Sequence, residues 1–537
     1  MKIWIVLILF FSWFCIQAQE SIVWIQFKYK NNLDYSLQKP KEYLSELSIQ
    51  RREIQNISID STDLPVNKSY LKNIEEAGFK IRFSSKWFNA VSAICIKNEN
   101  LGKLNTFSFV KNWKITKPLN TKNSYSEKSL YIPENKPYDS IYYGLSYPQL
   151  SMNNIPFLHQ MGWQGEGVRI AVLDAGFFGA KSTSSLLQLF NNQQVLDTFN
   201  FIDPTISVFN YSEHGTMVLS LLGGNRESVF VGSAPKAYYL LYATEDVNSE
   251  YQVEEDNWIA AAERADSLGV DIISSSLGYN TFWDVNQNYN YKDMNGKTAR
   301  ISLAATMAAN KGILVVSSAG NEGGKPWKYI TAPADADKIL TVGAVNNQGV
   351  KTGFSSLGYT SDGRVKPDVA TLGQNNVVNT KTGFFQSNGT SFSAPIIAGM
   401  AACLWQINRK ISAEKLREII QFTSSQYISP DSLIGYGIPN AKLAYYQLLF
   451  GVVSNTYHVF PNPAKNFINV HLFSEKDKNV DIEIFDLKGV KLSDYQNKTT
   501  FDGHNFFTIS TQNLAIGVYI LRINFENNKG VVKFVKE

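Results

Sequence analysis

From Val168 onward, short apolar runs alternate with stretches of helical periodicity. Val168–Leu173 is continuously apolar apart from Arg169 and leads into Asp174, a pattern typical of a buried parallel strand. Trp258–Leu268 places its apolar residues on one side and stops at Gly269, as a helix would. The alternation continues in the strand-like runs Val270–Ser274 and Ile313–Val316 and the helical stretch Ile301–Lys311. Residues 143–450 are therefore predicted to form an α/β domain, a doubly wound parallel sheet covered by helices on both faces.

The flanking stretches have a different texture. Strand-like runs at Ile22–Phe27 and Ala90–Ile96 surround a helix-like stretch, Glu42–Ile54, that carries the basic pair Arg51-Arg52. They predict a small α+β domain over residues 19–142, ending in a linker at Lys117–Lys136 that is poor in apolar residues.

Residues 451–537 read as a small antiparallel β-sandwich. Alternating strands such as Ile482–Phe485 and Val518–Ile523 are separated by turns at Lys488-Gly489 and Asp502-Gly503.

The first residues predict export. Lys2 precedes an uncharged run, Ile3–Ile16, and a small residue, Ala18, stands at a plausible cleavage point. The run is short for a membrane span, so residues 1–18 are interpreted as a signal peptide. No later segment is apolar enough to span a membrane, so the mature protein is expected outside the inner membrane without a span.

Composition narrows the function. The chain has 537 residues and a formal net charge of only +4, with no basic cluster that would bind nucleic acid. Of three cysteines, Cys15 belongs to the signal peptide, while Cys95 and Cys403 fall in different domains and form no disulfide framework. No Cys/His cluster suggests zinc and no glycine-rich loop suggests a nucleotide, so no cofactor is predicted to be required.

Four short motifs carry candidate chemistry. They begin or end at predicted elements and read Asp174-Ala-Gly176, His214-Gly-Thr216, Ser317-Ser-Ala-Gly-Asn321 and Gly389-Thr-Ser391-Phe-Ser-Ala-Pro395. A serine nucleophile needs an imidazole to take its proton, and the imidazole needs a buried carboxylate. The oxyanion of the tetrahedral intermediate needs donors, and a fixed amide supplies one. Each motif alone has an ordinary structural explanation, as a turn or a helix cap. Together, at the carboxyl ends of parallel strands, they indicate a catalytic site.

With these motifs, residues 154–449 resemble the subtilase family of serine proteases, whose triad occurs in the order Asp, His, Ser. The resemblance implies a subtilisin-like fold and serine-type endopeptidase activity on protein or peptide substrates. It implies that Asp174 orients the histidine, that His214 is the general base and acid, and that Ser391 is the nucleophile. Asn321 and the amide of Ser391 would then supply the oxyanion donors.

The same resemblance assigns substrate-binding segments. Ser276, Leu277 and Gly278 match the segment that pairs with the substrate as an added strand, and Ser318, Ala319 and Gly320 match the other wall of the primary pocket. The chain departs from the family at Ala175, Phe392 and Met217, where altered packing or rate is expected. The stretch Tyr279–Arg300 either shapes the cleft or is an ordinary surface loop.

The flanks also resemble known domains. Residues 19–142 loosely resemble subtilase pro-domains, which assist folding, inhibit the enzyme and are removed by self-cleavage. Phe460-Pro-Asn-Pro463, Gly517-Val-Tyr519 and the basic end at Lys533 and Lys536 resemble the sorting domain of the bacterial type IX secretion system. This implies passage across both membranes of a Gram-negative bacterium, then release or surface attachment. A generic sandwich that binds carbohydrate or protein is the alternative.

Two rival functions and one variant of the catalytic site are weighed against this interpretation. A catalytically inactive subtilase fold could serve as a surface adhesin or scaffold, although all four catalytic positions hold competent residues. A hydrolase of the same triad could act on esters, and the sedolisin variant is disfavoured because His214 stands in its full motif. Structural calcium is frequent in the family, but the scattered carboxylates assign no metal site.

Overall fold

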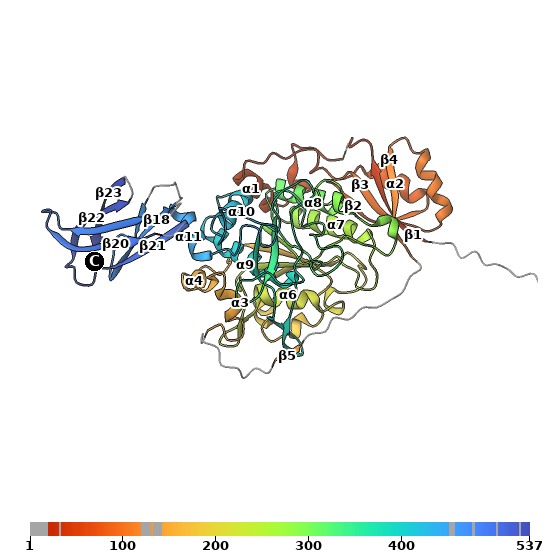
Figure 1. Ribbon diagram of the computed structural model, residues 1–537. Coiled ribbons are helices and arrows are strands. Elements are labelled where there is room, and N and C mark those ends of the chain that lie inside the picture. Colours follow the sequence, from red (N-terminus) through yellow and green to blue (C-terminus); the bar gives the residue numbers. More distant parts are fainter. Residues whose placement is uncertain are drawn as a thin grey trace, which may run out of the picture.

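The computed structural model of the protein describes residues 20–31, 34–119, 130–132, 142–450, 457–474, 478–500, 503–525 and 528–537. The predicted signal peptide, residues 1–18, lies outside the described residues. The described parts form an N-terminal domain, a central α/β domain and a C-terminal group of strands at one end of the molecule, beside α11 (Ala441–Phe450) (Figure 1).

The N-terminal domain is an antiparallel sheet with two helices. The strand order is β2-β3-β1-β4. Its elements are β1 (Ser21–Phe27), α1 (Glu46–Ile54), α2 (Lys68–Glu76), β2 (Phe79–Ser85), β3 (Ala90–Cys95) and β4 (Val110–Pro118). The expected helix over Glu42–Ile54 was wrong at its start. Ser45 caps α1 by accepting from the amide of Ser48, and the preceding residues Pro40–Glu42 form a separate 3-10 turn.

The central domain is built on a seven-stranded parallel sheet with the order β14-β13-β12-β11-β6-β10-β7. Its strands are β6 (Arg169–Asp174), β7 (Val195–Asn200), β10 (Tyr238–Ala243), β11 (Ile272–Ser275), β12 (Leu314–Ser318), β13 (Leu340–Val345) and β14 (Val369–Leu372). The predicted doubly wound α/β class is confirmed. The order reverses at β6, so the carboxyl ends of β6, β10 and β11 lie side by side at a switch point, where open parallel sheets place their sites.

Alternate residues of each strand fill two separate cores. In β6, Ile170 and Val172 pack in one core, together with α6 (His214–Gly223) and α9 (Thr390–Ile407). Ala171 and Leu173 pack in the other, together with α7 (Val253–Ser267) and α8 (Arg300–Asn310). The sheet is therefore buried on both faces, as its apolar runs predict.

Among the described residues, one helix, α9, is long and apolar enough to cross a membrane by length and composition. Its 83% burial inside the protein marks it as a core helix.

The C-terminal strands form two facing antiparallel sheets, ordered β17-β18-β21 and β20-β19-β22-β23, around one core, as predicted. They are β17 (Tyr457–Phe460), β18 (Phe467–Ser474), β19 (Asn479–Phe485), β20 (Lys491–Thr499), β21 (Gly503–Ser510), β22 (Gly517–Phe525) and β23 (Asn528–Lys536).

Candidate active site

Asp174 and His214 are joined by a short hydrogen bond at the candidate site. Asp174 ends β6 and is fully buried, and its Oδ1 accepts from His214 Nδ1 at 2.7 Å and from the Ala175 amide at 2.7 Å. An ionised carboxylate only accepts hydrogen bonds, so this contact suits an imidazole whose Nδ1 carries the hydrogen. In its neutral form such a ring has its lone pair at Nε2.

Glycine lets the two elements approach. Gly215 follows the histidine on α6, and a Cβ there would lie 2.3 Å from the Gly176 carbonyl oxygen. Gly176 itself has φ of +144°, and a Cβ at this position would clash with the Ser212 backbone. The glycines of both predicted motifs therefore permit the contact between the strand end and the helix start.

Ser391 lies at the start of α9, directly beside the β11 end. Its Oγ donates to the Ser276 carbonyl at 3.2 Å, and the Ser276 hydroxyl donates to the Ser391 carbonyl at 2.9 Å. The ring of Phe392, the next residue, lies 5.7 Å from the ring of His214. The first turn of α9 is therefore held between the histidine and the predicted substrate segment, and the helix N-terminus favours negative charge there.

Asn321 follows β12 and is oriented by a residue that sequence reasoning missed, Thr390. Asn321 Oδ1 accepts from the Thr390 amide at 2.9 Å and from its hydroxyl at 3.1 Å. The amide nitrogen must then be directed away from Thr390, which leaves its two hydrogens for another acceptor. Thr390 stands beside Ser391 inside the predicted motif, and its hydroxyl also accepts from the Gly320 amide at 3.2 Å.

The two predicted substrate segments lie side by side. They continue the parallel strands β11 and β12, and the Ser318 hydroxyl donates to the Leu277 carbonyl at 3.4 Å. A Cβ at Gly278 or at Gly320 would lie 2.2 or 2.7 Å from Thr331 Oγ1. Thr331, a second residue missed from the sequence, thus fills the space between the two glycines. Ser276 and Ala319, the remaining members of the two segments, are buried.

The three departures from the family pattern are packing positions. Ala175, Met217 and Phe392 are all buried and carry no titratable group. Asp174 Oδ2 is also buried, and it has no hydrogen-bond partner within the described part of the chain.

The insertion-like stretch after Gly278 is packed against the domain. Tyr279 is fully buried, and Tyr289 donates to Glu255 of α7. Trp283 and Val285 in the same stretch are exposed, so it is a surface segment that Tyr279 and Tyr289 anchor to the domain.

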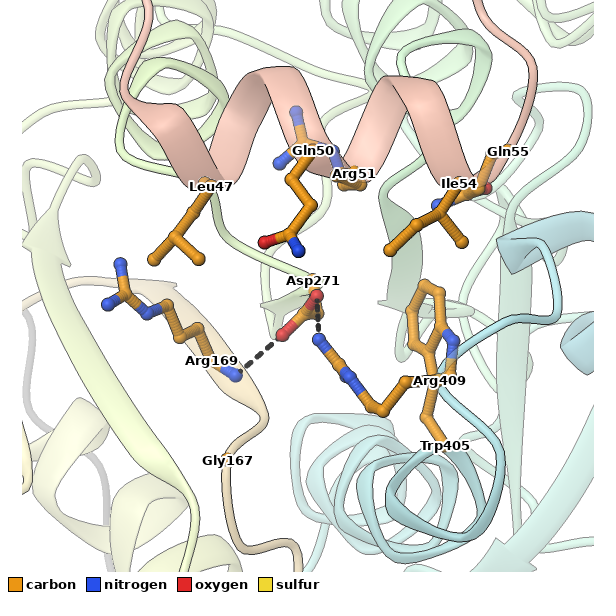
Figure 2. Close-up of a pocket in the computed structure, with 11 residues that line it drawn as sticks. Leu47, Gln50, Arg51, Ile54, Gln55, Gly167, Arg169, Asp271, Trp405 and Arg409 are labelled. Carbon is orange, nitrogen blue, oxygen red and sulfur yellow. Dashed lines mark hydrogen bonds and ion pairs between the residues drawn. The ribbon is translucent and has the colours of Figure 1, made fainter.

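A cavity of about 70 Å³ lies at the seam between the N-terminal domain and the central domain, away from the triad. Figure 2 shows Leu47, Arg51 and Ile54 of α1 above it, with Asp271 and Arg409 below. Asp271 accepts from the Arg409 guanidinium at 2.6 Å. Residues of both domains line the cavity, and no predicted catalytic or substrate-binding residue is among them.

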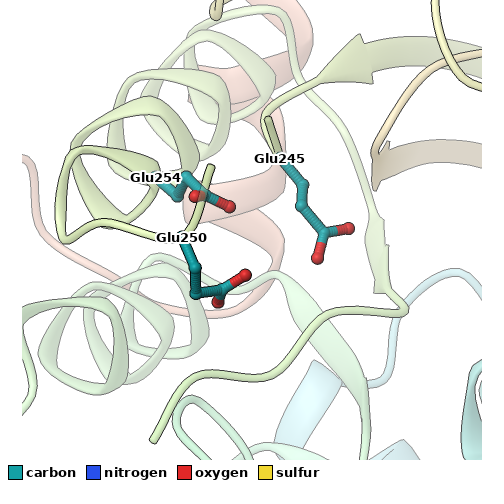
Figure 3. A group of neighbouring side chains, drawn as sticks. All are labelled: Glu245, Glu250 and Glu254. Carbon is teal, nitrogen blue, oxygen red and sulfur yellow. The ribbon is translucent and has the colours of Figure 1, made fainter. Parts of the chain in front are cut away.

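Within the described residues, one group of three carboxylates is close enough to share a cation: Glu245, Glu250 and Glu254, in and after the loop that follows β10 (Figure 3). No sequence pattern predicts this group, because the loop conformation brings the three residues together.

Three models of known protein families match different parts of the chain. The model of the subtilase family matches residues 165–437, that of the peptidase S8 propeptide domain of Bacteroidota matches residues 22–130, and that of the secretion system C-terminal sorting domain matches residues 458–537. The chain is 28% identical to subtilisin BL of Lederbergia lenta over 298 residues, covering 55% of this chain and 97% of the relative. It is 28% identical to subtilisin NAT of Bacillus subtilis subsp. natto over 306 residues, covering 56% and 72%.

A solved structure, the epidermin leader peptide processing serine protease of Staphylococcus aureus, matches the fold with a TM-score of 0.53 at 16% identity. The match covers 80% of this chain and 99% of that one.

Fold, site and relatives together define a serine-type endopeptidase that carries a pro-domain and is exported. The chain belongs to the subtilase family, and its C-terminal domain is a type IX sorting domain, which directs secretion or attachment at the cell surface.

Proposed function

We propose that this endopeptidase is made as a self-processing precursor and hydrolyses peptide bonds with Asp174, His214 and Ser391. The observation that carries the proposal is the 2.7 Å contact between His214 Nδ1 and the fully buried Asp174 carboxylate. It supports the tautomer in which Nε2 would accept the proton of Ser391 Oγ as that oxygen attacks the substrate carbonyl.

The remaining steps follow from the residues around Ser391. The oxyanion of the tetrahedral intermediate accepts from the Asn321 side-chain amide and the Ser391 backbone amide. His214 then donates its proton to the leaving amine, and an acyl-enzyme on Ser391 remains. Water attacks the acyl-enzyme with His214 again as base, and hydrolysis restores the serine.

We propose that the N-terminal domain inhibits the enzyme by packing against α7 and covering the approach to the cleft. Glu263 of α7 accepts from the amides of Lys86 and Trp87 at 2.7 and 3.2 Å. Lys117, at the end of β4, places its ammonium 2.7 Å from Asp246, in the loop after β10. Because β10 neighbours β6, the last strand of the pro-domain is directed toward the catalytic edge.

We infer the place of the maturation site from the described residues on either side of it. Leu119 still packs with the pro-domain side, against Ile22, Ile94 and the loop residue Tyr251. Strand β5 (Leu130–Ile132) instead pairs with β16 (Gly383–Ser387) of the catalytic domain. We therefore expect cleavage between residues 119 and 130, ahead of the 142/143 boundary expected from the sequence.

The test compares the wild-type precursor with Ser391→Ala. The wild type should release a pro-domain and should cut unfolded casein. N-terminal sequencing of the mature enzyme should place the cut between residues 119 and 130. Ser391→Ala should remain uncut and lose several orders of magnitude in rate. Ser393→Ala is the matched control, since Ser393 donates to the Leu372 carbonyl at 3.2 Å and touches no catalytic group named above.

The inactive adhesin or scaffold is the rival. It is favoured if wild type and Ser391→Ala are equally inert once the pro-domain has been removed by a second protease. Ester substrates would be indicated if the wild type hydrolysed activated esters but left casein and peptides intact.

A further inference from the structure

Three carboxylates converge at the catalytic edge without serving the triad. Glu245, Glu250 and Glu254 present ligand oxygens that all lie within 4.8 Å of one another (Figure 3). They occupy the loop between β10 and α7 and the first turn of α7. Burial, followed by the charges of Glu245 and Asp246, raises the pKa of Glu250 to about 8. Across the described residues, no Lys or Arg forms an ion pair with Glu250 or Glu254.

Two buried polar atoms of this region, Glu254 Oε2 and the Tyr279 hydroxyl oxygen, have no hydrogen-bond partner among the described residues. Glu254 is fully buried, and while its Oε1 accepts from the Tyr251 amide at 3.2 Å, its Oε2 has no hydrogen-bond partner in the described part of the structure. The hydroxyl of Tyr279 is likewise fully buried and unpartnered there, and Glu254, Glu245 and Glu250 are the charges that act on it most strongly. Unpaired buried polar groups are costly, so a ligand with several donors would stabilise these acceptors.

The group lies along the predicted path of a bound peptide. Tyr279 directly follows the substrate segment Ser276–Gly278, and the Trp283 amide donates to the Glu250 carbonyl at 2.9 Å. The Thr244 amide, next to Glu245, donates to the carbonyl of the catalytic Asp174 at 2.8 Å. The stretch that carries the three carboxylates therefore contacts both the end of β6 and the segment that follows β11.

The same loop already binds a cationic side chain of an extended segment. Lys117 of the pro-domain reaches Asp246 Oδ2 and the Ser249 hydroxyl, each at 2.7 Å, with its ammonium 6.0 Å from the Tyr251 ring. Lys117 lies on the N-terminal side of the expected maturation bond. A cationic residue upstream of a cleaved bond is therefore the kind of ligand that this loop accommodates.

We propose that Glu245, Glu250 and Glu254 form a subsite for the ammonium or guanidinium group of a substrate Lys or Arg on the N-terminal side of the scissile bond. Three donors of an ammonium, or the five of a guanidinium, match the oxygens that converge here, and the Tyr279 hydroxyl offers a further acceptor. The proposal rests on the proposed function, because the substrate must lie along Ser276–Gly278.

The experiment uses the mature wild-type enzyme and pairs of fluorogenic peptides that differ at one position, Lys against norleucine. The pair is moved through the positions upstream of the cut, and the readout is the ratio of the two kcat/KM values. At one position, the wild type should prefer Lys by about tenfold or more, as expected for a charge-assisted contact. The Glu250→Gln/Glu254→Gln double variant should bring that ratio to about one. Glu418→Gln on α10 (Ala413–Phe422) is the control and should keep the wild-type ratio, because its side chain is half exposed and pairs only with Lys415 among the described residues.

Two results would overturn the subsite. A wild type that cuts the norleucine peptides yet shows no Lys preference at any position refutes it, while the protease function stands. A metal site is indicated instead if calcium raises the Tm of the wild type but not of the double variant, again with no Lys preference. Failure of the proposed function looks different, since the wild type would then cut neither peptide of any pair.

Discussion

At the scale of single residues, the proposed oxyanion donor Asn321 is oriented by a neighbouring residue. Its oxygen is held by the amide and hydroxyl of Thr390, so the orientation of its nitrogen is set before substrate arrives. Asn321→Ala should lower kcat about 10²–10³-fold with little change in KM, since the lost donor acts on charge that develops only in the transition state.

The comparison for Asn321 is Asn388→Ala. Asn388 is exposed, lies close in sequence to Thr390 and accepts only from the Asn375 amide among the contacts described. Steady-state kinetics on a short peptide should leave its kcat close to that of the wild type. A rise in KM without a fall in kcat for Asn321→Ala would contradict the oxyanion role.

His159 gives a pH-dependent contribution to stability. Its ring is buried between the Tyr143 hydroxyl at 3.1 Å and the Ser233 carbonyl at 3.0 Å, and burial lowers its pKa to about 4 from an ordinary value of 6.5. Between these two pKa values, His159 therefore binds a proton in the unfolded chain but not in the folded chain. The free energy of unfolding should fall as the pH drops from about 6.5 to about 4, by roughly 3 kcal/mol for this group.

Urea unfolding of the Ser391→Ala precursor, with and without His159→Gln, measures that contribution without autolysis. The variant should lose less stability than its parent between pH 6.5 and pH 4. Equal losses would show that His159 is not the group that titrates.

At the scale of elements, helix α1 makes one of the contacts between the pro-domain and the central domain. Arg51 donates to the Lys311 and Val270 carbonyls and to Asp266, all in the central domain, and it is buried. Arg51→Met should weaken inhibition of the mature enzyme by added pro-domain about 10²-fold or more, because Asp266 loses one cation of a buried network. Since these partners belong to the other domain, the variant should fold normally.

The inhibition constant of the separately produced pro-domain measures the effect. Lys72→Met on α2 is the control, because Lys72 is exposed and its ion pair with Glu76 at 3.8 Å lies within the pro-domain. An unchanged constant for Arg51→Met would mean that the contact is not used in solution.

The same helix shows what the sequence could and could not predict. The apolar runs before Asp174, Ser274 and Ser317 identify parallel strands, and catalytic motifs at strand ends follow from that topology. Arg51-Arg52 was visible only as a basic pair, because its partner Asp266 is more than two hundred residues away. The Thr390–Asn321 and Glu245–Glu254 contacts depend on loop conformations that tertiary packing decides, and no local periodicity encodes them.

At the scale of the whole molecule, the sorting domain is joined to the enzyme by a small aromatic contact. Its strands enclose a core of their own, and Tyr446 of α11 stacks near Phe460 and Phe506 with ring centroids 4.5 and 4.9 Å away. Among the described residues after 456, none belongs to the two cores around the parallel sheet or to the proposed triad. Deleting residues 451–537 should therefore leave a folded, active protease that cannot pass the outer membrane.

Cell fractionation combined with a casein assay checks this separation of roles. The truncated enzyme should be found active inside the cell envelope, whereas the full-length chain should reach the surface or the medium. Full-length Ser391→Ala should be exported although inactive, because export is read from the C-terminal domain and catalysis from the central one. Secretion of the truncated enzyme would contradict the assignment of export to residues 451–537, and loss of its activity would show that the Tyr446 contact stabilises the catalytic domain.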